Sequence, residues 1–233
     1  MADVIKKNDF VEIDFVGRIT ETNAIFDTTK AAVAKKAGIA RENHVYRPVI
    51  ACVGQENVVK GLDTFLEGKE IGKSYTVSVL ADDAFGKKKA NLLKLVPTKN
   101  FLEAKIRPTP GLDVTIDGQY GTVKTVTGGR TIVDFNHPLS GKDLSYEITL
   151  LKKVTDVKDK LESFLSFGLG VNRDAFHITI TGNKANVKTH FALPKEFADL
   201  LNKKANELIS ELKEITYEEE KEHAHTEGHH THT

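Results

Sequence analysis

The sequence predicts an α+β fold built from three units. Residues 10–20 and 74–81 alternate apolar and polar side chains, as half-buried strands do. Residues 54–73 instead repeat apolar side chains at helical spacing and reach Gly68, a residue type that tolerates the left-handed conformation found at many helix ends. The first unit should therefore combine strands with a helix.

Composition narrows the class of protein. The 233 residues are 39% hydrophobic and 28% charged, which suits a globular protein with a real core. Because 33 basic residues balance 33 acidic ones and no apolar run is long enough to span a bilayer, we expect neither nucleic-acid nor membrane partners. A single cysteine, Cys52, cannot form a disulfide framework, and the N-terminus lacks the apolar region of a signal peptide, so we expect a cytoplasmic protein.

Further elements of the first unit follow in order. Residues 31–43 are alanine-rich and indicate a second helix. Pro48 opens an extended run that reaches Val53. Residues 144–153 resume the strand pattern, so the segment between 87 and 136 interrupts this unit.

The interrupting segment, residues 87–136, has its own folding signals. It carries nine basic and four acidic residues, a net charge of +5. Short apolar strands alternate with turn residues, and Asp117-Gly118 is a strong hairpin signal. We expect a small β-rich domain.

Residues 155–222 predict a third unit of mixed α/β character. A helix at 157–168 precedes a hairpin that turns at Gly182-Asn183. A long amphipathic helix follows Pro194, and a short strand ends the unit. This last helix could pack internally or mediate a homodimer.

The order of several short motifs resembles the FKBP family of peptidyl-prolyl isomerases. The matching stretches are the strand at 10–20, Phe26-Asp27, Val58-Val59-Lys60-Gly61-Leu62, Ala84-Phe85-Gly86 and the strand that begins at Tyr146. The interruption resembles the insert-in-flap chaperone domain of SlyD-like bacterial members and of the long archaeal type. The resemblance implies a bent antiparallel sheet around a short helix in residues 1–86 and 137–154, an insert-in-flap domain in 87–136, a C-terminal α/β domain in 155–222 and a His-rich tail in 223–233.

The resemblance also implies the site. Residues expected to carry catalysis are Phe26, Asp27, Val59, Phe85 and Tyr146. Residues expected to contact substrate in the proline pocket are Phe15, Val49, Val58, Leu62 and Leu139. Leu62 replaces a tryptophan common in eukaryotic members, and Phe85 and Phe15 stand where tyrosine is usual, so catalytic efficiency and drug binding are expected to differ.

The implied activity is rotation about X-Pro bonds in unfolded or partly folded proteins, which requires no cofactor. Apolar side chains of the insert, including Leu93, Val96 and Phe101, would hold such chains. The alternative is that these side chains fill the insert's own core. A pocket without useful catalysis, acting as a chaperone or binding module, is the first rival function.

The tail suggests a second rival, a metal-binding chaperone. Imidazoles at close spacing can converge on Ni²⁺, Zn²⁺ or Cu²⁺. The candidate ligands are His223, His225, His229, His230 and His232.

Overall fold

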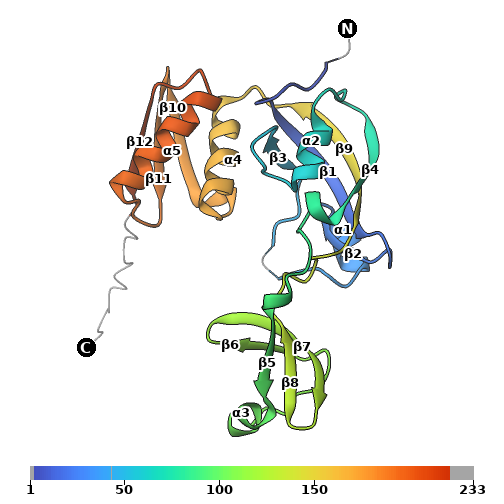
Figure 1. The fold of residues 1–233 in the computed structure, drawn as a ribbon. Helices are drawn as coiled ribbons and strands as arrows, with labels where there is room; N and C mark the ends of the chain where they lie inside the picture. Colours follow the sequence, from blue (N-terminus) through green and yellow to red (C-terminus); the bar gives the residue numbers. More distant parts are fainter. Residues whose placement is uncertain (1–2, 43, 221–233) are drawn as a thin grey trace, which may run out of the picture.

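The computed structural model describes residues 3–42 and 44–220, which form three parts (Figure 1). A central sheet domain carries the insert as an arm and the C-terminal domain beside it. The predicted α+β class is confirmed, because the sheets are mostly antiparallel and helices are few. Within these residues, no helix is both long and apolar enough to cross a membrane.

The central domain is a five-stranded sheet with one short helix against it. The strand order is β2-β1-β9-β4, and β3 pairs with the other end of β1. Its elements are β1 (Phe10–Ile19), β2 (Ile25–Thr28), α1 (Ala31–Lys36), β3 (Val49–Cys52), α2 (Lys60–Leu66), β4 (Ser74–Val79), η1 (Ala81–Asp83) and β9 (Leu144–Lys153). Helix α2 buries Leu62 and Leu66 in the same core as Val11, Ile13 and Ile148 of the sheet. The sheet therefore presents one apolar face to α2.

Both helices of this domain are shorter than the pattern predicts. The alanine-rich helix ends at Lys36, because Gly38 takes the left-handed conformation that stops it. The segment before α2 is a turn instead of a helix, with positive φ at Gly54 and Glu56. The buried carboxylate of Asp63 accepts hydrogen bonds from both of these backbone N–H groups, at 2.9 Å each, and so fixes the turn.

The insert is a four-stranded antiparallel sheet of order β5-β8-β7-β6. Its elements are η2 (Ala90–Leu92), β5 (Leu93–Pro97), α3 (Thr98–Glu103), β6 (Asp113–Ile116), β7 (Gln119–Thr127) and β8 (Arg130–Asp134). The hairpin between β6 and β7 turns at Asp117 and Gly118, both with positive φ, as its sequence predicts. Its small core contains Phe101, Val123 and Val133.

The C-terminal domain packs two helices on a three-stranded sheet of order β10-β11-β12. Its elements are α4 (Val157–Leu169), η3 (Arg173–Ala175), β10 (Phe176–Thr181), β11 (Lys184–Thr189), α5 (Lys195–Leu208) and β12 (Glu214–Glu219). Because α5 connects β11 to β12, these two strands pair in parallel. Helix α4 begins at Asp156, whose side chain accepts from the N–H of Asp159, and ends at a left-handed Gly170.

The core of the C-terminal domain extends into the central domain. Phe10, Ile50 and Cys52 of the central domain belong to the same buried cluster as Leu161 and Leu165 of α4. Burial, aided by the charge of nearby Asp63, raises the pKa of the Cys52 thiol to about 12, so this thiol is a core group. The first and third units of the sequence therefore pack against each other through a shared part of their cores.

Candidate proline-binding site

A cavity of about 440 Å³ lies beside α2 at the concave side of the central sheet. Residues from six separate segments of the central domain line it: Phe15, Phe26, Asp27, Val49, Val58, Val59, Leu62, Phe85 and Tyr146. The structure thus brings together all the pocket residues that the motif order predicts except Leu139. Leu139 is half-buried at the edge of the insert and does not line the cavity.

Aromatic rings form the inner wall of the cavity. The ring of Tyr146 lies 5.9 Å from that of Phe15 and 5.8 Å from that of Phe26, measured between centroids. Interplanar angles of 65° and 87° make both contacts edge-to-face, an arrangement that aromatic quadrupoles favour. Tyr146 supplies the one hydroxyl among the four aromatic side chains of this wall and lip, since positions 15, 26 and 85 are phenylalanine.

Gly17 makes this wall possible, and the motifs gave no signal for it. It lies in register with Asp27 on β2 and with Tyr146 on β9. A Cβ atom at this position would lie 2.8 Å from Cζ of Phe26 and 3.1 Å from Cε1 of Tyr146. Only a residue without a side chain leaves room for the two rings.

Asp27 lies at the exposed mouth of the cavity. Its Oδ1 accepts a hydrogen bond of 2.8 Å from the N–H of Thr28. Burial raises the pKa of the Tyr146 phenol, and the negative charge of Asp27 adds to the rise. The phenol is therefore a neutral hydrogen-bond donor at physiological pH.

Val59 precedes the first turn of α2 and also lines the cavity. Its backbone N–H donates no hydrogen bond to any of the residues that the structure describes. Backbone N–H groups at helix starts lack partners within the helix. This N–H can donate a hydrogen bond to a carbonyl oxygen of a bound peptide.

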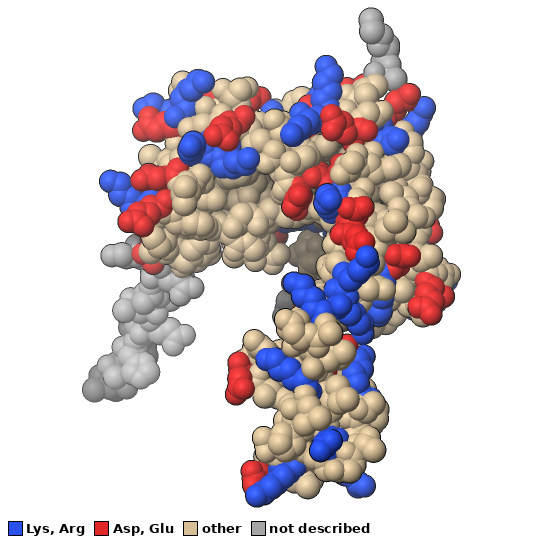
Figure 2. Space-filling model, viewed as in Figure 1, with Lys and Arg blue, Asp and Glu red and all other residues tan. Residues whose placement is uncertain are grey.

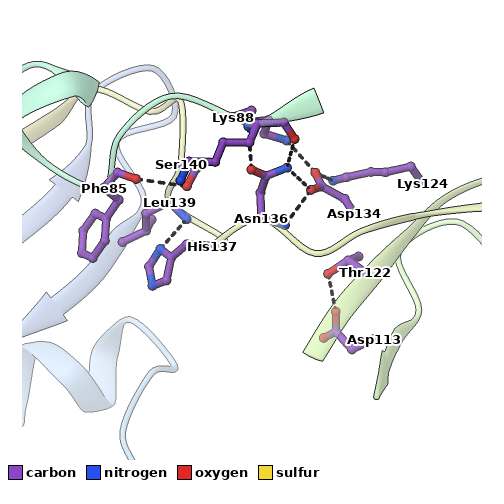
Figure 3. A network of polar contacts seen from close by, with 11 residues as sticks. Phe85, Lys88, Asp113, Thr122, Lys124, Asp134, Asn136, His137, Leu139 and Ser140 are labelled. Atoms are coloured by element: carbon purple, nitrogen blue, oxygen red, sulfur yellow. Dashed lines mark hydrogen bonds and ion pairs between the residues drawn. The ribbon is translucent and has the colours of Figure 1, made fainter. Parts of the chain in front are cut away.

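Phe85 forms the lip of the cavity and is held by the segment that returns from the insert (Figure 3). Its ring stacks on that of His137, with centroids 4.4 Å apart. Its carbonyl oxygen accepts a hydrogen bond of 3.1 Å from Oγ of Ser140. Nδ1 of His137 accepts a hydrogen bond from the N–H of Leu139, which fixes the imidazole orientation. Leu139 therefore supports the lip through its backbone.

The insert joins the central domain at a buried polar network (Figure 3). Asp134, whose side chain is 6% exposed, accepts hydrogen bonds from Nζ of Lys88 at 2.9 Å and Nδ2 of Asn136 at 2.8 Å. Asn136 also exchanges two hydrogen bonds with the backbone of Lys89. Burial alone would raise the pKa of the Asp134 carboxyl, but the hydrogen bonds from Asn136 and Lys88 outweigh it and lower the pKa to about 2.

The insert exposes part of its apolar surface. Leu93 and Leu95 are 43% and 57% exposed, and Ile132 lies directly opposite Leu95 in the sheet. Phe101, which the apolar pattern assigns to the binding surface, is only 4% exposed and fills the core, with the half-buried Val96 packed against it. Basic side chains gather where the insert meets the sheet domain (Figure 2).

The C-terminal domain supplies the opposite wall of the cavity. Ser163, Ser166 and Phe167 of α4 line it, together with Asn172 and Arg173 just after this helix. Nothing in the motif order indicates these residues, because their place beside the pocket depends on packing between α4 and β3, which are distant in the sequence.

The candidate metal ligands of the tail lie outside the described residues. These are His223, His225, His229, His230 and His232. Within residues 3–42 and 44–220, no group of three or more His, Cys, Asp or Glu side chains is arranged to hold a metal ion.

The fold is an antiparallel sheet domain with a largely apolar cavity and a small β-rich insert, and comparisons with known proteins agree with the resemblance that the motif order predicts. A family profile described as "FKBP26, IF domain" matches residues 94–139. The short-type peptidyl-prolyl cis-trans isomerase of Methanocaldococcus jannaschii is 29% identical over 158 residues, which are 68% of this chain and 97% of that protein.

Two proteins of Escherichia coli K12 are also similar. The FKBP-type 16 kDa peptidyl-prolyl cis-trans isomerase is 27% identical over 157 residues, 65% of this chain and 95% of that protein. The isomerase SlyD is 29% identical over 131 residues, 54% of this chain and 64% of SlyD. These relatives and the insert profile confirm the predicted resemblance to the FKBP-type peptidyl-prolyl cis-trans isomerase family.

Proposed function

We propose that this chain accelerates cis–trans rotation at X-Pro bonds of unfolded or partly folded proteins, and that its insert holds those chains near the cavity. The observation that supports this most is the convergence of the family's motif residues on one largely apolar cavity. Each relative described above is named as an isomerase of this kind.

The chemistry suits such a cavity. Rotation about an X-Pro bond has a barrier of about 18–20 kcal/mol, because amide resonance must be broken. A twisted amide has less charge separation than a planar one, so an apolar, aromatic environment disfavours it less. The walls of Phe26, Phe85 and Tyr146 would therefore bind the transition state better than the planar ground state. No nucleophile, metal or cofactor is required.

Polar groups would orient the substrate. The Val59 N–H and the Tyr146 hydroxyl are the candidate donors to substrate carbonyl oxygens. Asp27, at the mouth, would orient the dipole of the bound amide and would not act as a general base. An Asp27→Ala variant with unchanged activity would remove Asp27 from this mechanism.

The surface of Leu93, Leu95 and Ile132 is the proposed client-binding surface of the insert. A domain as small as this buries little of its chain surface, and exposed apolar side chains suit unfolded segments. Holding a client beside the cavity raises the local concentration of its proline bonds.

The test is refolding of a proline-limited protein, with the full chain and with a chain whose residues 90–134 are replaced by a short loop. We expect the full chain to accelerate the slow phase strongly and the deletion variant to act only on short peptides. If neither form accelerates refolding or peptide isomerisation, the chain is a non-catalytic chaperone, a function that the two missing tyrosine hydroxyls at 15 and 85 favour.

The tail and the C-terminal helix carry two further proposals. Metal binding through the His-rich tail predicts that truncation after Glu222 abolishes Ni²⁺ binding.

Exposed Phe197 and Leu200 on α5 support a homodimer through this helix, which light scattering would detect. Proline-containing proteins in the cytoplasm are the proposed partners.

A further inference from the structure

The proline cavity continues beyond the central domain. A second cavity of about 290 Å³ lies between the segment 52–57 of the central domain and the helices α4 and α5. Asn57 and Phe167 line both cavities, so the two spaces meet at this pair. Phe164, Gly168 and Leu208 from the C-terminal helices then line the second space.

Helix α4 presents one face to the path formed by these two connected cavities. Ser163, Ser166 and Phe167 are three and four residues apart, which places their side chains on the same side of a helix. Phe167 is 38% exposed although most apolar side chains of α4 are packed in the core. An exposed aromatic ring at the junction of two cavities is suited to contact an apolar side chain.

The wall is held rigidly. Oγ of Ser163 donates to the carbonyl oxygen of Ile50 on β3. The guanidinium of Arg173 contacts Asp159 at 2.8 Å and Glu162 at 3.0 Å. The core residues packed beneath α4 also hold this helix in place. The wall that α4 supplies to the cavity is therefore preformed.

The two arginines that line the first cavity are compensated, whereas Glu56 and Lys204, which line the second, form no ion pair among the described residues. Arg173 is paired with two carboxylates, and Arg47, which lines the first cavity, lies 3.0 Å from Asp174. Oδ1 of Asn57 accepts from the N–H of Cys52 at 2.8 Å, while its amide nitrogen donates to none of the described residues. That amide can donate to a peptide carbonyl, and Phe164, Phe167 and Leu208 give the second cavity an apolar wall that suits an apolar side chain.

We propose that the substrate chain leaves the proline pocket over Phe167, and that α4 forms an outer subsite for an apolar substrate side chain a few positions from the proline. This inference rests on the proposed isomerase function and adds a specificity-determining residue to it. The continuity of the two cavities through Phe167 and Asn57 selects an extended peptide as the occupant.

The test compares Phe167→Ala with Phe197→Ala. Phe197 is the matched control, because it is a phenylalanine of the same domain, is 40% exposed and lines neither cavity. Each protein is assayed with a proline tetrapeptide and with peptides extended by leucine-containing segments on either side of the proline. Thermal unfolding and light scattering follow stability and oligomeric state.

We expect Phe167→Ala to lower kcat/KM about tenfold for peptides extended on one side and to leave the tetrapeptide unchanged. Phe197→Ala should match the wild type on every peptide. Equal behaviour of the two variants, or an equal loss on tetrapeptide and extended peptides, would overturn the outer subsite. An unmodified chain that fails on the tetrapeptide would instead contradict the isomerase function itself.

Discussion

The imidazole of His137 stacks on the ring of Phe85, with the two planes only 5° apart. The first residue belongs to the segment returning from the insert, and the second forms the lip of the proline cavity. The insert and the cavity are therefore joined through a direct ring contact as well as through the chain.

Replacing His137 by alanine should disorder the lip. We expect kcat/KM for a proline tetrapeptide to fall about threefold to tenfold, because one face of Phe85 loses its support. His177→Ala is the control, since His177 is an exposed histidine of the C-terminal domain. The measurement is the rate of peptide isomerisation by the two variants. Equal rates would show that the stacking of His137 on Phe85 does not contribute to catalysis.

Tyr146→Phe should reduce catalysis without reducing stability. Loss of a hydrogen bond from the hydroxyl to the substrate costs about 1 kcal/mol, or roughly fivefold in kcat/KM. The matched control is Tyr217→Phe, because the Tyr217 hydroxyl is buried with no hydrogen-bond partner among the described residues. That control should keep full activity. An unchanged rate in Tyr146→Phe would assign the phenol to packing alone.

Gly17→Ala should damage the cavity wall. The added Cβ forces Phe26 and Tyr146 apart, and overpacking of this kind costs about 1–3 kcal/mol. We expect isomerisation to fall more than tenfold while the fold persists in circular dichroism. Gly121→Ala, which meets Phe135 at the same 2.8 Å, is the control in the insert. It should destabilise the insert yet leave tetrapeptide isomerisation intact.

Asp134 makes the insert sensitive to acid. Because its pKa is lowered to about 2, its contribution is complete above about pH 4 and is lost as the pH falls from there toward 2. The full contribution is about 2 kcal/mol. Asp134→Asn should therefore speed hydrogen exchange of β8 amides at about pH 5, with the difference from wild type shrinking near pH 2. Asp117→Asn, at the exposed turn between β6 and β7, serves as the control. A difference that persists unchanged at the lower pH would contradict the titration of Asp134.

The sequence predicts the central domain well because its signals are local. Alternation and helical spacing identify β1, β4 and α2, and the motif order brings Phe26, Val59 and Phe85 into one cavity. The element lengths are less well predicted. The turn before α2 depends on the carboxylate of Asp63, which no periodicity signals.

Two parts of the candidate site also escape prediction, and the reason is long-range packing. Phe101 has the same apolar character as Leu93, and only the packing of α3 decides that the first is core and the second surface. Phe167 reaches the cavity because α4 covers β3, a contact between segments more than a hundred residues apart. Neither of these packing contacts can be predicted from the local sequence pattern.

The paired hydrogen bonds between Lys89 and Asn136 bring the entry and exit of the insert side by side, at 2.7 and 3.1 Å. Phe85, His137 and Ser140 all lie on the cavity side of this pair (Figure 3). For protein engineering, the pair marks a graft boundary. Another small domain in place of residues 90–134 would leave the contacts of the cavity lip intact.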